Sequence, residues 1–390
     1  MTKKILIQNG LLVLPEGIRP GGLLVEGGRV AAILDAPVAA DEVIDAEGLY
    51  VAPGFIDLHT HGAGGADFMD GTVEAYLTAS RMHAAHGTTL LYPTTLTSTK
   101  ELLLETFRTY EAALAVNDGA AFGGMHLEGP YFSMEYRGAQ DPRYLRDPCP
   151  EEYLDILSRS PHIARWSFAP ERPGASAFAA ELHRRGILAS IAHTGATFEE
   201  CDAAFRSGST HMTHFYSCMS TITRRNAYRW AGVIEYGYYQ DGMTVEIIAD
   251  GIHVPSPLLH LIVKIKGVDR IALVTDSMRA AGMPEGPSIL GGLSDGQEVI
   301  VEDGVAKLTD RSAFAGSVAT ADRLVRTMVR EGGTTLSEAV QMMTLNPARI
   351  MGIDGHKGSL APGKDADIVL FDADVRVRHT LVAGRTVFAG

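Results

Sequence analysis

Short apolar runs and longer amphipathic segments alternate along the middle of the chain. The amphipathic segments, such as residues 73–87 and 175–186, have helical periodicity and close on a glycine, the usual residue at a helix C-terminus. The apolar runs have the length of buried strands, and there are eight of them: Val51–His59, Thr88–Thr94, Phe122–Glu128, Ala164–Pro170, Leu188–His193, Thr210–His214, Thr244–Asp250 and Ile271–Asp276. Eight β-α repeats over this length predict an α/β protein built on a (β/α)8 barrel.

The two ends of the chain have a different pattern, with short strands and tight turns. In residues 1–50, Asn-Gly and Gly-Gly pairs separate apolar runs, as in hairpins. Residues 358–390 show the same pattern of short strands and turns. Apolar and polar residues alternate in part of that segment, as they do in a half-buried strand. We therefore expect these two ends to form one small β-sandwich domain and residues 51–357 to form the barrel. Residues 295–315 alternate around an acidic turn, which predicts a hairpin inserted after the eighth strand.

Composition and charge narrow the classes of function. The chain has 390 residues, of which 46% are hydrophobic, enough for a large core. Its net charge of -13 argues against nucleic-acid binding, because such proteins need a basic surface to displace counterions. A local basic pocket for a small anion remains compatible with this charge.

The cysteines and the N-terminal segment bear on the compartment. Cys149, Cys201 and Cys218 show no CxxC spacing and suit a reducing environment. The first residues lack the long apolar core of a signal peptide, and no run approaches the roughly 18 apolar residues of a membrane helix. We expect a cytoplasmic protein that does not associate with a membrane.

Most of the expected strands end in a side chain that can bind metal or carry a proton. These residues are His59 and His61 on the first strand, Glu128 on the third, His193 on the fifth, His214 on the sixth, Asp250 and His253 on the seventh and Asp276 on the eighth. The carboxyl ends of barrel strands converge on one face, where active sites lie. Alternate residues share a face of a strand, so Asp57, His59 and His61 should all point into the barrel.

Each of these residues alone has an ordinary structural explanation. A single buried histidine is usually a satisfied core residue, and a glutamate before Gly-Pro is usually a turn residue. The whole set is hard to explain as packing, because a buried charge without a partner is costly. Imidazole and carboxylate ligands without thiolate suit zinc, iron(II), manganese or cobalt. The sequence therefore predicts a metal site at the mouth of the barrel.

Several motifs follow one another along the chain: PGFIDLHTHG, HLEGP, IAHTGAT, MTHFYSCM, IADGIHV, LVTDS and GSLAPGKDADIVLFD. They resemble those of the N-acetylglucosamine-6-phosphate deacetylase family of the amidohydrolase superfamily. The HxH and TDS elements are common to the superfamily, whereas HLEGP and ADGIHV are more specific to the deacetylases. The resemblance covers nearly the whole chain. It implies hydrolysis of N-acetylglucosamine 6-phosphate to acetate and glucosamine 6-phosphate.

The resemblance also implies roles for individual residues. Glu128, His193 and His214 would hold the main catalytic metal. His59 and His61 would hold a second ion, with Glu128 able to bridge. One or two divalent ions per subunit are implied, with zinc or iron first and manganese or cobalt as alternatives. Asp276 would act as general base and then as general acid.

Two further residues match family positions that contact the sugar phosphate. They are His253 and Arg225, and the arginine typically reaches in from the neighbouring subunit. The resemblance therefore implies a homodimer with Arg225 contributed across the interface.

Three features depart from the family pattern, and all fall among residues expected to contact the substrate. Ser217-Cys218-Met219 stands where an Asn-Ala-Met segment is usual, and Gln140 stands where many members have a histidine near the scissile carbonyl. The segment 224–240 is unusually aromatic. An alternative substrate is therefore another N-acyl amino sugar, phosphorylated or not, such as N-acetylgalactosamine 6-phosphate. A catalytically inactive barrel that serves as a scaffold is disfavoured, because Asp276 and all expected metal ligands are present.

Overall fold

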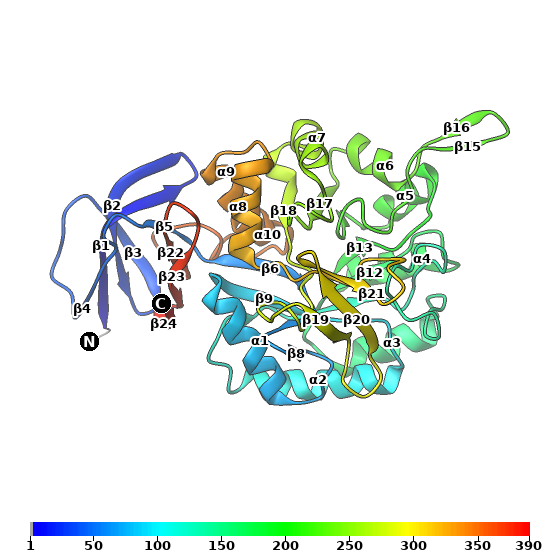
Figure 1. The fold of residues 1–390 in the computed structure, drawn as a ribbon, viewed down its shortest axis with the longest axis horizontal. Coiled ribbons are helices and arrows are strands. Elements are labelled where there is room, and N and C mark those ends of the chain that lie inside the picture. Colours follow the sequence, from blue (N-terminus) through cyan, green and yellow to red (C-terminus); the bar gives the residue numbers. More distant parts are fainter. Residues whose placement is uncertain (1–2) are drawn as a thin grey trace.

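The computed structural model describes residues 3–390 and shows two parts side by side (Figure 1). The larger part is a barrel of parallel strands with helices outside it. The smaller part is a β-sheet that contains both ends of the described chain.

Eight parallel strands form the barrel and follow one another around it in chain order. They are β6 (Phe55–Thr60), β9 (Thr88–Thr95), β11 (Met125–Glu128), β12 (Ile163–Phe168), β13 (Leu188–Ile191), β14 (His211–Met212), β17 (Thr244–Ile247) and β18 (Ile271–Leu273). A parallel bridge between Thr60 and Ser277 brings the segment after β18 beside β6 and nearly closes the barrel. The eight-stranded barrel expected from the sequence is thus confirmed.

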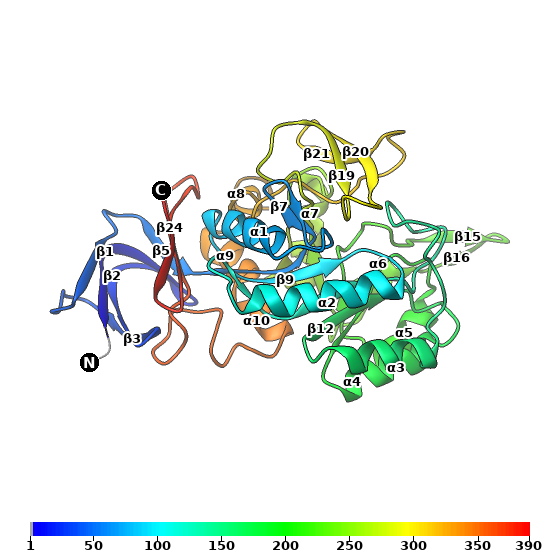
Figure 2. The same cartoon turned by 90° about the horizontal axis from the view of Figure 1, so that it is seen from below.

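Helices fill the connections and pack on the outside of the barrel, as Figure 2 shows for the first four. They are α1 (Val73–Ala85), α2 (Lys100–Leu114), α3 (Pro150–Arg159), α4 (Ala175–Arg184), α5 (Phe198–Arg206), α6 (Val233–Tyr239), α7 (Ser256–Lys266), the 3-10 helix η1 (Val268–Arg270), α8 (Ala321–Glu331), α9 (Leu336–Met343) and α10 (Leu345–Ile350). The helices expected within residues 73–87 and 175–186 are present as α1 and α4. In the described chain, no helix combines the length and apolar character needed to span a bilayer.

Two expected strands are each divided in the structure. Val51–His59 is wrong as one strand, because β5 (Tyr50–Pro53) lies in the terminal sheet and only β6 lies in the barrel. Gly54 makes the passage between the sheets, where a Cβ would lie 2.2 Å from the Thr89 side chain. The segment 122–128 is likewise divided at a glycine pair into β10 (Ala121–Phe122) and β11.

The terminal part is one mixed sheet formed by both ends of the chain, as expected. Its strands are β1 (Lys4–Leu14), β2 (Gly17–Glu26), β3 (Arg29–Leu34), β4 (Glu42–Asp45), β5, β22 (Ile368–Phe371), β23 (Val377–Val382) and β24 (Arg385–Ala389). Residues from the first and last strands share one apolar core, including Ile7, Leu23 and Leu370. In place of the expected sandwich, the structure thus has a single connected sheet around a common core. The domain boundaries at residues 50 and 358 stay a prediction.

Three smaller sheets complete the fold. The expected hairpin after the eighth strand is present as β20 (Gln297–Glu302) and β21 (Val305–Leu308), and β19 (Gly286–Leu290) extends it to three strands. A second hairpin, β15 (Thr223–Arg225) with β16 (Tyr228–Trp230), projects away from the body of the molecule (Figure 1). A short pair, β7 (Gly62–Ala63) with β8 (Ala66–Asp67), follows β6 directly.

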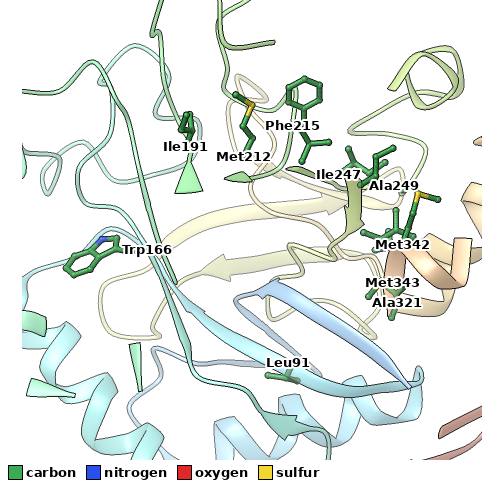
Figure 3. Packing of buried hydrophobic residues seen from close by; sticks show 14 of the residues in the cluster. Leu91, Trp166, Ile191, Met212, Phe215, Ile247, Ala249, Ala321, Met342 and Met343 are labelled. Carbon is green, nitrogen blue, oxygen red and sulfur yellow. The ribbon is translucent and has the colours of Figure 1, made fainter. Parts of the chain in front are cut away.

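A continuous apolar core lies between the barrel strands and the helices (Figure 3). Trp166, Ile191 and Met212 come from strands β12 to β14, whereas Met342 and Met343 come from α9. Alternate residues of a strand face opposite sides. The neighbours of these outward apolar residues are polar and contact one another inside the barrel, as Arg165 and Thr213 do. The barrel interior therefore carries buried charge directly beneath the carboxyl ends of its strands.

Candidate metal centre and active site

The carboxyl ends of the barrel strands surround a cavity of about 330 Å³, a size that suits a small-molecule ligand. Nine of the site residues expected from the sequence line it: His61, Glu128, Gln140, His193, His214, Ser217, Cys218, His253 and Asp276. Among the others, His59 is fully buried against this set, and Arg225 lies on the projecting hairpin. The fold thus brings together residues that are up to 217 positions apart, as with His59 and Asp276.

Glu128, at the end of β11, is the centre of the cluster. Its Oε1 atom lies 3.2 Å from His193 Nε2 and 3.1 Å from His214 Nε2. Its Oε2 atom lies 3.3 Å from His61 Nε2 and accepts a 2.6 Å hydrogen bond from Gln140 Nε2. Its Oε1 atom also lies 3.5 Å from His59 Nε2, so one carboxylate contacts all four expected histidine ligands.

Asp276 faces the other side of the same cluster. Its Oδ1 atom lies 3.2 Å from both His59 Nε2 and His61 Nε2. The backbone holds it there independently of the carboxylate. The Asp276 N–H donates to the carbonyl of His59, and the Ser317 N–H donates to the carbonyl of Asp276. The proton carrier expected from the sequence is thus placed directly beside the HxH histidines.

Three residues of the cluster have left-handed backbone conformations. The φ angles are 46° for His193, 30° for His214 and 46° for Asp276. Such conformations cost non-glycine residues about 1 to 3 kcal/mol each and persist only where the surroundings impose them. All three residues line one cavity. We infer that these costly backbone conformations are kept because they direct the three side chains into it.

Three histidines present the same nitrogen to the cluster because their other nitrogen is held by an acceptor. The Nδ1 atoms lie 3.2 Å from the Thr94 carbonyl oxygen for His61, 3.1 Å from the Tyr136 carbonyl oxygen for His193, and 3.1 Å from Glu246 Oε1 for His59. A carbonyl or carboxylate oxygen only accepts, so each Nδ1 carries a proton and Nε2 is the nitrogen left to bind a metal. The Nε2 atoms of His59 and His61 then face each other at 3.3 Å. A cation satisfies such an arrangement.

The charges of the cluster are strongly coupled. Burial raises the pKa of the Glu128 carboxyl, but the neighbouring charge of His59 and hydrogen bonds with His193 and His214 bring it well below its usual value. Burial lowers the pKa of His61, but hydrogen bonds with Asp276 and Glu128 outweigh this and raise it to about 10. Buried ionised carboxylates need a compensating positive charge. A proton on His61 supplies part of it, and a metal ion can take that proton's place at Nε2.

Four of the residues expected to contact the substrate line the cavity: Gln140, Ser217, Cys218 and His253. Gln140 donates to Glu128, and its Oε1 atom accepts from the Thr97 N–H at 2.9 Å, so its amide has a fixed orientation. His253 is held by Asp250, whose Oδ2 atom lies 2.8 Å from His253 Nδ1. Asp250, a candidate from its place at a strand end, therefore orients His253.

Arg225 does not line the cavity of its own chain. It is exposed on the projecting hairpin, with its guanidinium 5.3 Å from the centre of the Trp230 ring. A role for Arg225 in the site thus requires a second subunit, and it stays a prediction.

Comparison with known proteins identifies the family. The model of the amidohydrolase family matches residues 50–387 of this chain. The chain belongs to the amidohydrolase family. The narrower resemblance is confirmed as well. N-acetylgalactosamine-6-phosphate deacetylase of Escherichia coli O157:H7 is 34% identical over 93% of this chain and 93% of its own length. N-acetylglucosamine-6-phosphate deacetylase of Lysinibacillus sphaericus is 34% identical over 88% of this chain and 86% of its own length.

Solved structures of amidohydrolases agree with this assignment. A structure of a mutant N-acetyl-D-glucosamine-6-phosphate deacetylase from Mycobacterium smegmatis, in complex with N-acetyl-D-glucosamine-6-phosphate, matches with a TM-score of 0.90 and 33% identity. Each chain is covered completely in that comparison. The enzyme from Pasteurella multocida matches with a TM-score of 0.92 and 29% identity over 99% of this chain and 100% of its own.

The residues of this amidohydrolase fit a divalent metal. Two sets of three have ligand atoms within 4.8 Å of one another: His59, Glu128 and His214, and His59, His61 and Asp276. Both sets contain imidazole and carboxylate donors, the ligands that catalytic zinc and iron sites use. The sets share His59 and do not include His193, which contacts Glu128 from the side. His59 thus belongs to both sets, whereas the sequence had assigned it only to the second ion. The ligand sets inferred from the family stay a prediction.

Removing metal from this amidohydrolase should lower its thermal stability. Without an ion, the buried carboxylates of Glu128 and Asp276 lose compensating charge, and a ligand that binds only the folded state stabilises it. At a concentration one hundred times its Kd, the ion contributes about 2.7 kcal/mol. The unfolding midpoint of chelator-treated protein, before and after Zn²⁺ addition, measures this effect. Ca²⁺, which prefers six or more oxygen ligands, is the control, and an equal shift with Ca²⁺ would contradict the assignment.

Sequence reasoning missed a buried polar network, with an ion pair between Arg165 and Glu246, beneath the candidate metal ligands. It consists of His126, Arg165, His211 and Glu246, all fully buried. Arg165 interrupts the mainly apolar run IARWSF, and Glu246 interrupts TVEIIAD. Strands of a parallel barrel are buried on both faces, so a charged residue in their middle needs a buried partner. That interruption was the available signal, although it does not say which residues pair.

Proposed function

We propose that this protein removes the acetyl group from N-acetylglucosamine 6-phosphate, giving acetate and glucosamine 6-phosphate. The observation that carries this proposal is the placement of Asp276 beside a histidine and carboxylate cluster, within a cavity of about 330 Å³. Relatives named as deacetylases of hexosamine 6-phosphates, which match over nearly the whole chain, support the choice of reaction.

The reaction needs an activated amide and two proton transfers. A divalent ion, when bound, polarises the amide carbonyl and acidifies a water molecule. Asp276 accepts the proton of the attacking water. It then donates a proton to the departing nitrogen, because an amine leaves far more readily than an amide anion. Gln140, fixed by Thr97 and Glu128, borders the same space with an amide hydrogen to spare.

We propose zinc or iron(II) as the ion, with manganese and cobalt as alternatives, because the candidate ligands are imidazoles and carboxylates. Glu128 is central to the proposed site, because its Oε1 atom contacts His59, His193 and His214 and its Oε2 atom contacts His61. Two ions per subunit are proposed, and a single ion is the alternative because the two compact sets of ligands share His59.

The proposed active form is a homodimer in a reducing cytoplasm. The three cysteines are free thiols, which suits that compartment. The β15–β16 hairpin projects with exposed Tyr228 and Trp230, and aromatic and arginine side chains are enriched at protein interfaces. Arg225 on this hairpin would enter the cavity of the partner subunit and bind the phosphate beside His253.

Arg225→Ala should mainly raise KM for the phosphorylated substrate. The guanidinium binds phosphate oxygens in two parallel hydrogen bonds and lies remote from the scissile amide, so kcat should change less. Steady-state kinetics on N-acetylglucosamine 6-phosphate and on unphosphorylated N-acetylglucosamine separate the two effects. Arg229→Ala, on the other strand of the same hairpin, is the matched control. Equal loss on both substrates would exclude phosphate binding by Arg225.

A second candidate substrate is N-acetylgalactosamine 6-phosphate. It is favoured by the relative that bears that name and by Gln140, Ser217 and Cys218, which depart from the family pattern and line the cavity. Acetate release from a panel of N-acetyl hexosamines, with and without 6-phosphate, tests both candidates. The proposal fails if wild-type protein loaded with Zn²⁺ or Fe²⁺ releases no acetate from any 6-phosphate, or prefers the unphosphorylated sugars.

A further inference from the structure

An ion pair lies inside the barrel, directly beneath the cluster. Arg165 on β12 and Glu246 on β17 are both 0% exposed, and Arg165 Nη1 donates to Glu246 Oε2 at 2.7 Å. Burying two charges is expensive, and an apolar pair of similar volume is often equally or more stable. Stability alone therefore does not explain this pair.

The contacts of Glu246 show what the charge does. Its Oε1 atom lies 3.1 Å from His59 Nδ1 and accepts from the backbone N–H of His214 at 3.2 Å. Its Oε2 atom is held by Arg165 and lies 3.1 Å from His211 Nε2. One carboxylate oxygen thus contacts His59 and His214, which belong to the same set of candidate ligands. The other oxygen is held by Arg165.

Arg165 anchors the pair to several strands. Its other hydrogen bonds go to the Leu58 carbonyl at 3.0 Å, to Thr213 Oγ1 at 2.9 Å and to Ser190 Oγ at 3.4 Å. Leu58 and Thr213 immediately precede His59 and His214 in the chain. The guanidinium therefore holds the backbone next to His59 and the side chain next to His214, and it keeps the Glu246 carboxylate ionised and in place.

We propose that Glu246, held by Arg165, is a positioning residue that makes His59 a metal ligand. An ionised carboxylate only accepts hydrogen bonds, so it keeps the His59 proton on Nδ1 and leaves the Nε2 lone pair facing His61 and Asp276. The inference rests on the proposed metal site. It adds that the ion bound through His59 depends on a residue that does not touch it.

The test is Glu246→Gln, which keeps the shape of the side chain but leaves one acceptor atom. The charged Arg165 retains that oxygen, so the new NH2 group turns toward His59 Nδ1 and the His214 N–H. A donor then faces a donor, and His59 changes to the tautomer that blocks Nε2. Mutation of such outer partners lowers metal affinity about 10- to 100-fold. Co²⁺ titrated into metal-free protein, followed by its visible absorption, should show this loss.

Two further variants serve as controls for Glu246→Gln. Ser190→Ala removes a contact of Arg165 without touching Glu246 or His59, and it should leave Co²⁺ affinity near the wild-type value. His59→Asn removes the residue through which Glu246 acts. In that background Glu246→Gln should lower Co²⁺ affinity little further, whereas equal losses in both backgrounds would overturn the proposal.

Circular dichroism and thermal unfolding show whether each variant is folded. Should Glu246→Gln fail to fold, the double variant R165M/E246L replaces the pair by apolar side chains and is expected to fold. It should show the same loss of Co²⁺ affinity. Wild-type affinity in either folded variant overturns the proposal, and so does failure of both to fold, because the pair would then serve the fold. No substrate enters this titration, so an inactive wild type that shows the Glu246 effect would contradict only the proposed deacetylation.

Discussion

Asp276→Asn should fold normally and lose about two to four orders of magnitude in kcat on the hexosamine 6-phosphate. An amide cannot take the proton of the attacking water or give one to the departing amine. The residue itself should stay in place, because its position depends on backbone hydrogen bonds with His59 and Ser317. Asparagine also tolerates the left-handed backbone that Asp276 adopts.

Metal content decides how this loss is understood. Asp276 Oδ1 lies 3.2 Å from the Nε2 atoms of His59 and His61, close enough for it to serve as a ligand as well. If the variant keeps most of its metal and its unfolding midpoint, the loss belongs to proton transfer. A fall in metal content in proportion to kcat would make Asp276 a ligand and refute its role as the proton carrier.

Glu128→Gln should lower metal content and activity together. The neutral amide is a much poorer ligand than the carboxylate, and it also removes the negative charge that faces His193 and His214. Loss of one charged ligand should cost more affinity than loss of an outer hydrogen-bond partner, which costs about 10- to 100-fold. Elemental analysis after gel filtration, together with acetate release, measures both quantities.

A half-buried carboxylate outside the cavity provides the control for Glu128→Gln. Glu152 pairs with Arg146 at 2.7 Å and does not line the cavity. Glu152→Gln should therefore affect stability without changing metal content per folded chain. Full metal occupancy with normal turnover in Glu128→Gln would show that the centre of the cluster has been misassigned.

The periodicity of the chain determined the architecture. Short apolar runs that alternate with helical segments specify a barrel, because strand and helix bury their apolar residues with different periods. The same pattern located most of the candidate site. His61, Glu128, His193, His214 and Asp276 were found as polar residues at strand ends, and the geometry of a parallel barrel brings strand ends together.

Tertiary structure decided what depends on contacts between distant segments. The apolar run of residues 51–59 does not show that Gly54 passes from one sheet to another, because both sheets bury the same kind of residue. Glu246 was visible as a charge within a strand, but its pairing with Arg165 and His59 follows from the closure of the barrel. Arg225 shows the converse: its side chain suits a phosphate, yet the fold places it on a hairpin outside its own cavity. Local sequence specifies periodicity and chemical type, whereas pairing across long separations in the chain is set by how the elements pack.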